Sequence, residues 1–95
     1  MSISNRDELD AVLAEMTLKI DRLLNEGGHR SELVEANRNL KRLGEYLKKH
    51  EKPTGGQVKS LLGATSLIRD KFQNDDRLCD QSFDVEDFVQ AMGTE

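Results

Sequence analysis

The chain has 95 residues, of which 36% are hydrophobic and 34% are charged, and its formal net charge is −4. This length suits one small domain, and the charged fraction exceeds the roughly 25% of an average globular domain, as in long-helix proteins. The single cysteine, Cys79, excludes an intramolecular disulfide and fits a reducing compartment. No apolar run reaches the about 20 residues that a membrane-spanning helix needs. We therefore expect one cytoplasmic domain over residues 1–95, with no membrane partner.

The first helix is predicted over residues 5–26. Asn5 is a favoured N-cap residue, and Glu8 stands three residues later, which is the spacing of a capping box. Behind this cap, apolar residues recur at alternating steps of four and three, the period of a helix that buries one face. Gly27 and Gly28 end the helix and favour a short link to an antiparallel neighbour. The apolar row consists of Leu9, Leu13, Met16, Ile20 and Leu23.

The second helix is predicted over residues 31–50. Ser31 is a good cap at its start, and Pro53 prevents the helix from continuing. Its apolar residues fall on two interleaved rows with a spacing of seven, which indicates a face buried against neighbouring helices. One row consists of Leu33, Leu40 and Leu47, and the other of Ala36, Leu43 and His50.

The third helix is predicted over residues 55–73. Thr54 and Gln57 repeat the capping-box spacing just before a new apolar row begins. The row again alternates steps of three and four, so this helix also buries one face. Its members are Val58, Leu61, Thr65, Ile68 and Phe72.

A short fourth helix is predicted over residues 84–92, with Asp84 as its cap. Four apolar residues in it form one stripe over two turns, at positions i, i+3, i+4 and i+7. An isolated helix of this length is marginal in water, so the stripe must dock on the bundle or on a partner. The stripe consists of Val85, Phe88, Val89 and Met92.

These elements predict an all-α fold, an antiparallel three-helix bundle with a short C-terminal fourth helix. Aromatic residues make up only 4% of the chain, so the core must depend on aliphatic side chains and methionine. The core is expected to contain Leu9, Leu13, Met16, Ile20, Leu23, Leu33, Leu40, Leu43, Leu47, Val58, Leu61, Ile68 and Phe72.

The C-terminal segment resembles an EF-hand calcium loop. Laid out over twelve residues, it places Asp76, Asp80, Asp84 and Asp87 at loop positions 1, 5, 9 and 12. Leu78 stands at position 3, where an oxygen ligand is expected. The resemblance implies a degenerate calcium binder as a third-ranked function, and no other motif predicts a metal or a cofactor.

Charge is distributed unevenly along the chain. Residues 1–29 carry three basic and six acidic side chains, residues 30–71 carry ten and five, and residues 72–95 carry one and seven. The basic middle is the basis of an alternative function, nucleic-acid binding. An intramolecular alternative is that the acidic end packs on this basic face. The candidate phosphate-binding residues are Arg38, Lys41, Arg42, Lys48 and Lys49.

No motif brings together a nucleophile, a base or a set of metal ligands, so we expect a protein that is not an enzyme. A helical scaffold without such chemistry favours a protein-interaction module, namely an adaptor, chaperone or inhibitor that regulates a partner protein. Residues 23–47 turn on the pair Gly27 and Gly28 between two amphipathic helices. In this plan the first hairpin is similar to the helical-hairpin cochaperones of type III secretion needle subunits. Self-association through leftover seams is a further alternative. The candidate partner-binding residues are those of the stripe, Val85, Phe88, Val89 and Met92.

Overall fold

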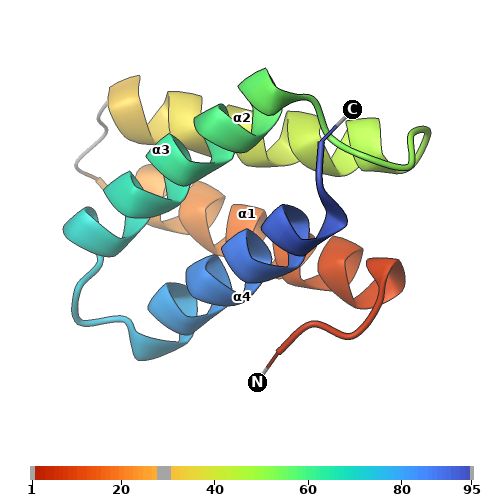
Figure 1. Cartoon of the computed structure of the whole chain (residues 1–95). Coiled ribbons are helices and arrows are strands. Elements are labelled where there is room, and N and C mark those ends of the chain that lie inside the picture. Colours follow the sequence, from red (N-terminus) through yellow and green to blue (C-terminus); the bar gives the residue numbers. More distant parts are fainter. Residues whose placement is uncertain (1, 28–30, 95) are drawn as a thin grey trace.

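Four packed helices make up the fold. The computed structural model describes residues 2–27 and 31–94, and all regular structure in this part of the chain is helical. The helices are α1 (Arg6–Asn25), α2 (Ser31–Leu47), α3 (Gly55–Lys71) and α4 (Asp76–Met92). As Figure 1 shows, they pack against one another, and α1 and α3 each contact both α2 and α4. None of these four helices combines the length and the hydropathy needed to cross a membrane.

All four helices contribute to the core. Every predicted core residue is buried except Leu23, Val58 and Phe72, which are half-buried. In α1 the last buried residue of the apolar row is Leu24 rather than Leu23. The reason is that the 3.6-residue period of a straight helix drifts away from a strict 3.5-residue repeat. The fourth helix adds further core side chains, which are Leu78, Val85 and Val89.

The fourth helix corrects the predicted architecture. It is 17 residues long and begins at Asp76, well before the predicted start at residue 84. Its N-cap is Asp75 instead of Asp84, and the Asp75 carboxylate accepts a hydrogen bond from the Leu78 amide at 3.0 Å. The described residues therefore form four helices of comparable length, and not three helices with a short appendage.

Two predicted helix starts are confirmed by their caps. The Asn5 side chain accepts a hydrogen bond from the backbone amide of Glu8 at 2.9 Å. Thr54 and Gln57 form the predicted capping box, with reciprocal bonds between side chain and backbone of 3.1 Å and 2.9 Å. Both caps satisfy amides that a helix leaves without partners in its first turn.

Two predicted helix ends are corrected. The second helix ends at Leu47 rather than at residue 50, and the third ends at Lys71 rather than at residue 73.

Arg6, at the start of α1, donates from its guanidinium to the carbonyl oxygens of Leu47 and His50, both at 2.7 Å, and also to that of Glu51. This cation satisfies carbonyl groups that the end of α2 leaves free, and it ties α1 to that end.

Candidate interaction surfaces

The predicted partner-binding stripe faces largely into the bundle. Val85 and Val89 are fully buried, while Phe88 and Met92 are half-buried and pack against the core. The fourth helix is therefore docked on its own bundle. The two valines have no exposed surface to offer a partner, so a partner that used the whole stripe would have to displace α4.

A buried polar network joins α4 to α3. The Arg69 guanidinium donates to the Glu86 carboxylate at 2.7 Å and to the Ser82 hydroxyl at 3.2 Å. The Thr65 hydroxyl donates to the same carboxylate, and the Arg69 guanidinium carbon lies 4.1 Å from the centre of the Phe83 ring. Thr65 and Ser82 are fully buried, and Glu86 is only 9% exposed. These polar groups satisfy one another where water is excluded.

Two ion pairs and one side-chain hydrogen bond join α4 and its N-cap to α1. The Lys19 ammonium lies 2.6 Å from the Asp75 carboxylate, and the Arg77 guanidinium lies 2.8 Å from the Glu15 carboxylate. The Gln81 side-chain amide also donates to Glu15. The Lys19 ammonium and the backbone amide that Asp75 caps lower the pKa of the Asp75 carboxyl below its usual value. The fourth helix is thus fixed from both sides.

The loop implied by the EF-hand resemblance does not form. Residues 76–87 lie within α4, where successive side chains project around the helix axis. An EF-hand loop instead wraps its oxygen ligands around one ion. In the part of the chain that the structure describes, no group of three or more His, Cys, Asp or Glu side chains is placed to hold a metal ion. The prediction of a calcium loop is therefore corrected.

Four of the five predicted phosphate-binding residues share one hollow beside α2, here called the basic hollow. Its volume is about 490 Å³. The Tyr46 and His50 rings stack there with their centres 3.8 Å apart. Lys48 lies outside it, 3.3 Å from Glu45 and 4.0 Å from Asp10. The hollow is lined by Arg38, Lys41, Arg42, Glu45, Tyr46, Lys49, His50 and Gln57.

Intramolecular ion pairs neutralise part of the basic hollow. Arg38 pairs with Glu35 at 2.9 Å, and Lys41 pairs with Asp21 of α1 at 3.1 Å. The other two cations of the hollow form no ion pair with a residue that the structure describes. The acidic helix α4 contacts α1 and α3 rather than α2. The suggested packing of the acidic end on the basic face is therefore corrected for α4.

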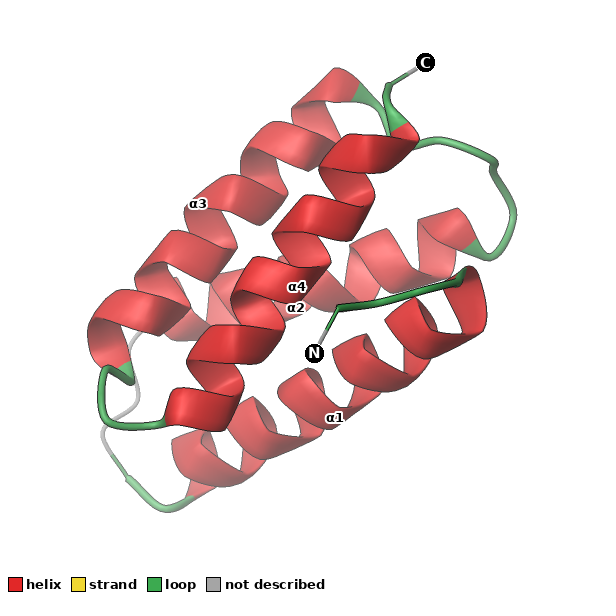
Figure 2. Ribbon diagram, turned by 60° about the horizontal axis from the view of Figure 1, so that its bottom comes forward, coloured by secondary structure: helices red, strands yellow, loops and turns green. Residues whose placement is uncertain are grey.

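A groove that sequence reasoning missed lies between α1 and α4, with a volume of about 960 Å³. Figure 2 shows the N-terminal segment running across the space between these two helices, and residues 2–4 line the groove. We call it the α1–α4 groove. Its apolar lining consists of Ile3, Ala11 and Val12, and its charged lining of Glu8, Glu15, Arg77, Asp80 and Asp84.

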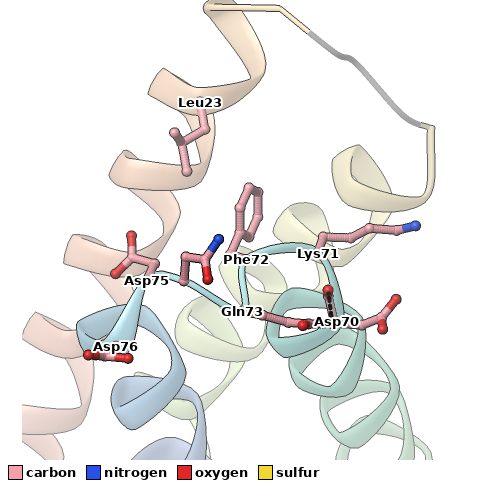
Figure 3. Close-up of a pocket in the computed structure, with 8 residues that line it drawn as sticks. Leu23, Asp70, Lys71, Phe72, Gln73, Asp75 and Asp76 are labelled. Carbon is pink, nitrogen blue, oxygen red and sulfur yellow. Dashed lines mark hydrogen bonds between the residues drawn. The ribbon is translucent and has the colours of Figure 1, made fainter.

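Another hollow, of about 650 Å³, lies between the end of α1 and the α3–α4 connection. Figure 3 shows Phe72 extending from this connection toward the part of α1 that carries Leu23. The Gln73 side-chain amide donates to the Asp70 carbonyl oxygen at 3.1 Å, and the Asp75 carboxylate is paired with α1. Asp70, Gln73 and Asp75 thus already form a hydrogen bond or an ion pair within the chain. This hollow is therefore a weaker candidate for ligand binding.

Comparisons with known proteins do not add a function. The chain matches no protein family, no curated protein and no solved structure. The α1–α4 groove and the basic hollow are therefore the two surfaces from which a function can be argued.

Proposed function

We propose that this protein is a small non-enzymatic interaction module, an adaptor, chaperone or inhibitor that binds another protein through its helical surface. The observation that carries the proposal is the α1–α4 groove. Its floor is apolar, and Ile3 and Val12 in that floor pack against the core. A groove between two helices is a common docking site for an amphipathic helix of a partner.

The proposal includes an antiparallel course of the helices within one domain. Contacts between opposite helix ends support this course, since Arg6 at the start of α1 bonds to Leu47 at the end of α2. Lys48, just beyond α2, lies 4.0 Å from Asp10 in the second turn of α1. We also infer a cytoplasmic location, because the one cysteine of the chain has no second thiol with which to form an internal disulfide.

The groove supports partner binding better than the stripe on α4 does. Removing α4 from the bundle would expose Val85 and Val89, which are now fully buried. It would also break the pair between Arg69 and Glu86. Binding in the groove needs neither change, so Phe88 and Met92 remain secondary candidates at the edge of the core.

A tagged pull-down from native cell extract tests the proposal. The full chain is compared with Ala11→Lys, which places a long cation in the groove, and with Ala14→Lys, which places the same side chain on the neighbouring α1–α2 surface. We expect one stoichiometric protein that survives nuclease treatment, is lost with Ala11→Lys and is kept with Ala14→Lys. A preparation that captures no protein, or only further copies of this chain, would contradict the proposed function.

Nucleic-acid binding is the second candidate, and a specific observation favours it. The stacked rings of Tyr46 and His50 lie among four cations in the basic hollow, and single-stranded nucleic acid is bound by such a combination of aromatic and basic groups. This function predicts an affinity that falls steeply with salt concentration. Arg42→Ala should weaken binding, whereas Lys48→Ala, outside the hollow, should change it less. A flat salt response would remove this candidate.

A further inference from the structure

We propose that the partner segment that occupies the α1–α4 groove is a basic amphipathic helix. This inference rests on the proposed function and names the chemistry of the partner. The partner helix presents an apolar stripe to the floor of the groove and lysine or arginine side chains to its rim. The other occupants of such a groove, an acidic or an uncharged helix, are alternatives that the experiment distinguishes.

The charge of the rim is the first support for this occupant. The groove is lined by four carboxylates and one guanidinium. The guanidinium, from Arg77, is bound to Glu15, so that pair contributes little net charge. Asp80 forms no ion pair with any residue in the described ranges and is exposed. Glu8 also forms no ion pair with a residue in the described ranges. Glu8 and Asp80 alone therefore give the rim an excess of negative charge, which attracts a cationic segment and disfavours an anionic one.

The sequence of α4 extends this negative rim. Asp76, Asp80, Asp84 and Asp87 follow one another at steps of four, four and three, which places them on one side of the helix. Like charges four residues apart on a helix destabilise it. The fold tolerates this repulsion alongside an apolar groove. A cationic helix in the groove would bring opposite charge to this side of α4, next to Asp80, which lines the groove.

The floor of the groove is suited to a side chain from outside. Ala11 is exposed and has a small side chain, so α1 leaves space in the groove at this position. Ile3 and Val12 also line the groove and remain partly exposed. An apolar residue of the partner can therefore reach apolar surface between the two helices without any change in the packing of the core.

The test uses three synthetic helical peptides of about 18 residues, or about five turns. All share one leucine face, and their polar positions carry lysine, glutamine or glutamate. Binding to the full chain is measured by fluorescence anisotropy at low and at moderate salt. We expect the lysine peptide to bind at least about tenfold more tightly than the glutamate peptide, with an advantage that shrinks as salt screens the rim.

Matched variants locate the site. Ala11→Lys and Asp80→Asn should each lower the affinity for the lysine peptide several-fold. Ala14→Lys and Asp70→Asn make the same charge changes outside the groove and should leave this affinity nearly unchanged. Equal or tighter binding of the glutamate or glutamine peptide would overturn the proposed occupant. Equal losses in the groove variants and in their controls would overturn the proposed site. If the pull-down still captured a partner in either case, the interaction function would stand and only this inference would fail.

Discussion

The Arg69 guanidinium lies 2.7 Å from the Glu86 carboxylate, and both side chains are largely withdrawn from solvent. This pair joins α3 to α4 at a place where the sequence predicted no contact. Thr65 and Ser82 complete its hydrogen bonding. The pair therefore makes the C-terminal quarter of the chain part of the bundle, and not a detachable arm.

Removing the Glu86 carboxylate should destabilise the fold. Glu86→Ala leaves the Arg69 cation partly buried without its partner, and breaking a buried pair from one side costs roughly 3–5 kcal/mol. Because Arg69 keeps some access to water, we expect the free energy of unfolding to fall by about 3 kcal/mol. Urea unfolding measures it, with Asp87→Ala as the control on the exposed side of the same helix. A loss no greater than that of the control would show that α4 is not held by this pair.

Truncating Leu78 tests whether the first half of α4 belongs to the core. Leu78 and Leu40 are both fully buried, and a leucine-to-alanine change in a core costs about 2–5 kcal/mol. We expect Leu78→Ala and Leu40→Ala to lower the free energy of unfolding by comparable amounts, each in a single transition. A loss well under about 1 kcal/mol for Leu78→Ala would instead indicate an independent fourth helix.

Gly63 is a position where the chain can be made more stable. It lies in α3, it is exposed, and a methyl group added there would meet no atom within 4 Å. Alanine is favoured over glycine in a helix by about 1 kcal/mol, so Gly63→Ala should raise the melting temperature by roughly 4–8 °C. Calorimetry measures the shift. An unchanged or lower melting temperature would contradict the helical placement of this residue.

The Asp75 carboxylate should make stability depend on pH. Its pKa is lowered in the folded state by Lys19 and by the amide that it caps, so its contribution is fully present above the usual aspartate pKa. The contribution is lost as the pH falls through the lowered pKa. Asp75→Asn keeps a capping side chain but removes the charge. The difference in unfolding free energy between the two proteins should be about 1 kcal/mol or less at neutral pH and should vanish in acid.

Unfolding of both proteins over a pH series checks this dependence. Lys19 is about half exposed, with a side-chain exposure of 42%, which is why the expected difference is small. A difference that stays constant from neutral to acidic pH would mean that the charge of Asp75 contributes nothing, and that only its role as a cap matters.

The repeated apolar rows made most of the bundle predictable from the sequence. Leu9, Leu13, Met16 and Ile20 are buried as their spacing indicates, and so are the members of the two rows of the second helix except His50. His50 lies beyond the end of α2 and is exposed, so its placement in a buried row was wrong. The caps at Asn5 and Thr54 also follow from local sequence. Such features are predictable because they depend on residues within one or two turns of each other.

The first half of α4 was not predictable in the same way. Its core positions continue the four-three spacing from Leu78 to Val85, but the intervening position is Ser82. The Ser82 hydroxyl is satisfied inside the bundle by donating to the Cys79 carbonyl oxygen at 2.6 Å and by accepting from Arg69. One of these partners, Arg69, lies on another helix, and the sequence alone does not distinguish such a buried serine from a loop serine. The apolar row was therefore interpreted as interrupted at Ser82.

The α1–α4 groove was missed for a related reason. Ala11 and Asp80 both line it but are far apart in the chain, and only the docking of α4 brings them to one surface. The bond from Arg6 to the Leu47 carbonyl oxygen was equally invisible, because it links residues 41 positions apart. Leu78 standing seven residues before Val85 was the one signal that could have extended α4 toward the groove.

Nuclear magnetic resonance of the isotopically labelled full chain, titrated with the lysine peptide, tests the central claim most directly. We expect the amide signals of Ala11, Val12 and Gln81, which line the α1–α4 groove, to shift most, while those of Val85 and Val89 keep the dispersion of a docked α4. The largest shifts in the basic hollow around Arg42 and Lys49, or a collapse of the Val85 and Val89 signals, would contradict it. The first result would place binding on α2, and the second would show that α4 leaves the bundle.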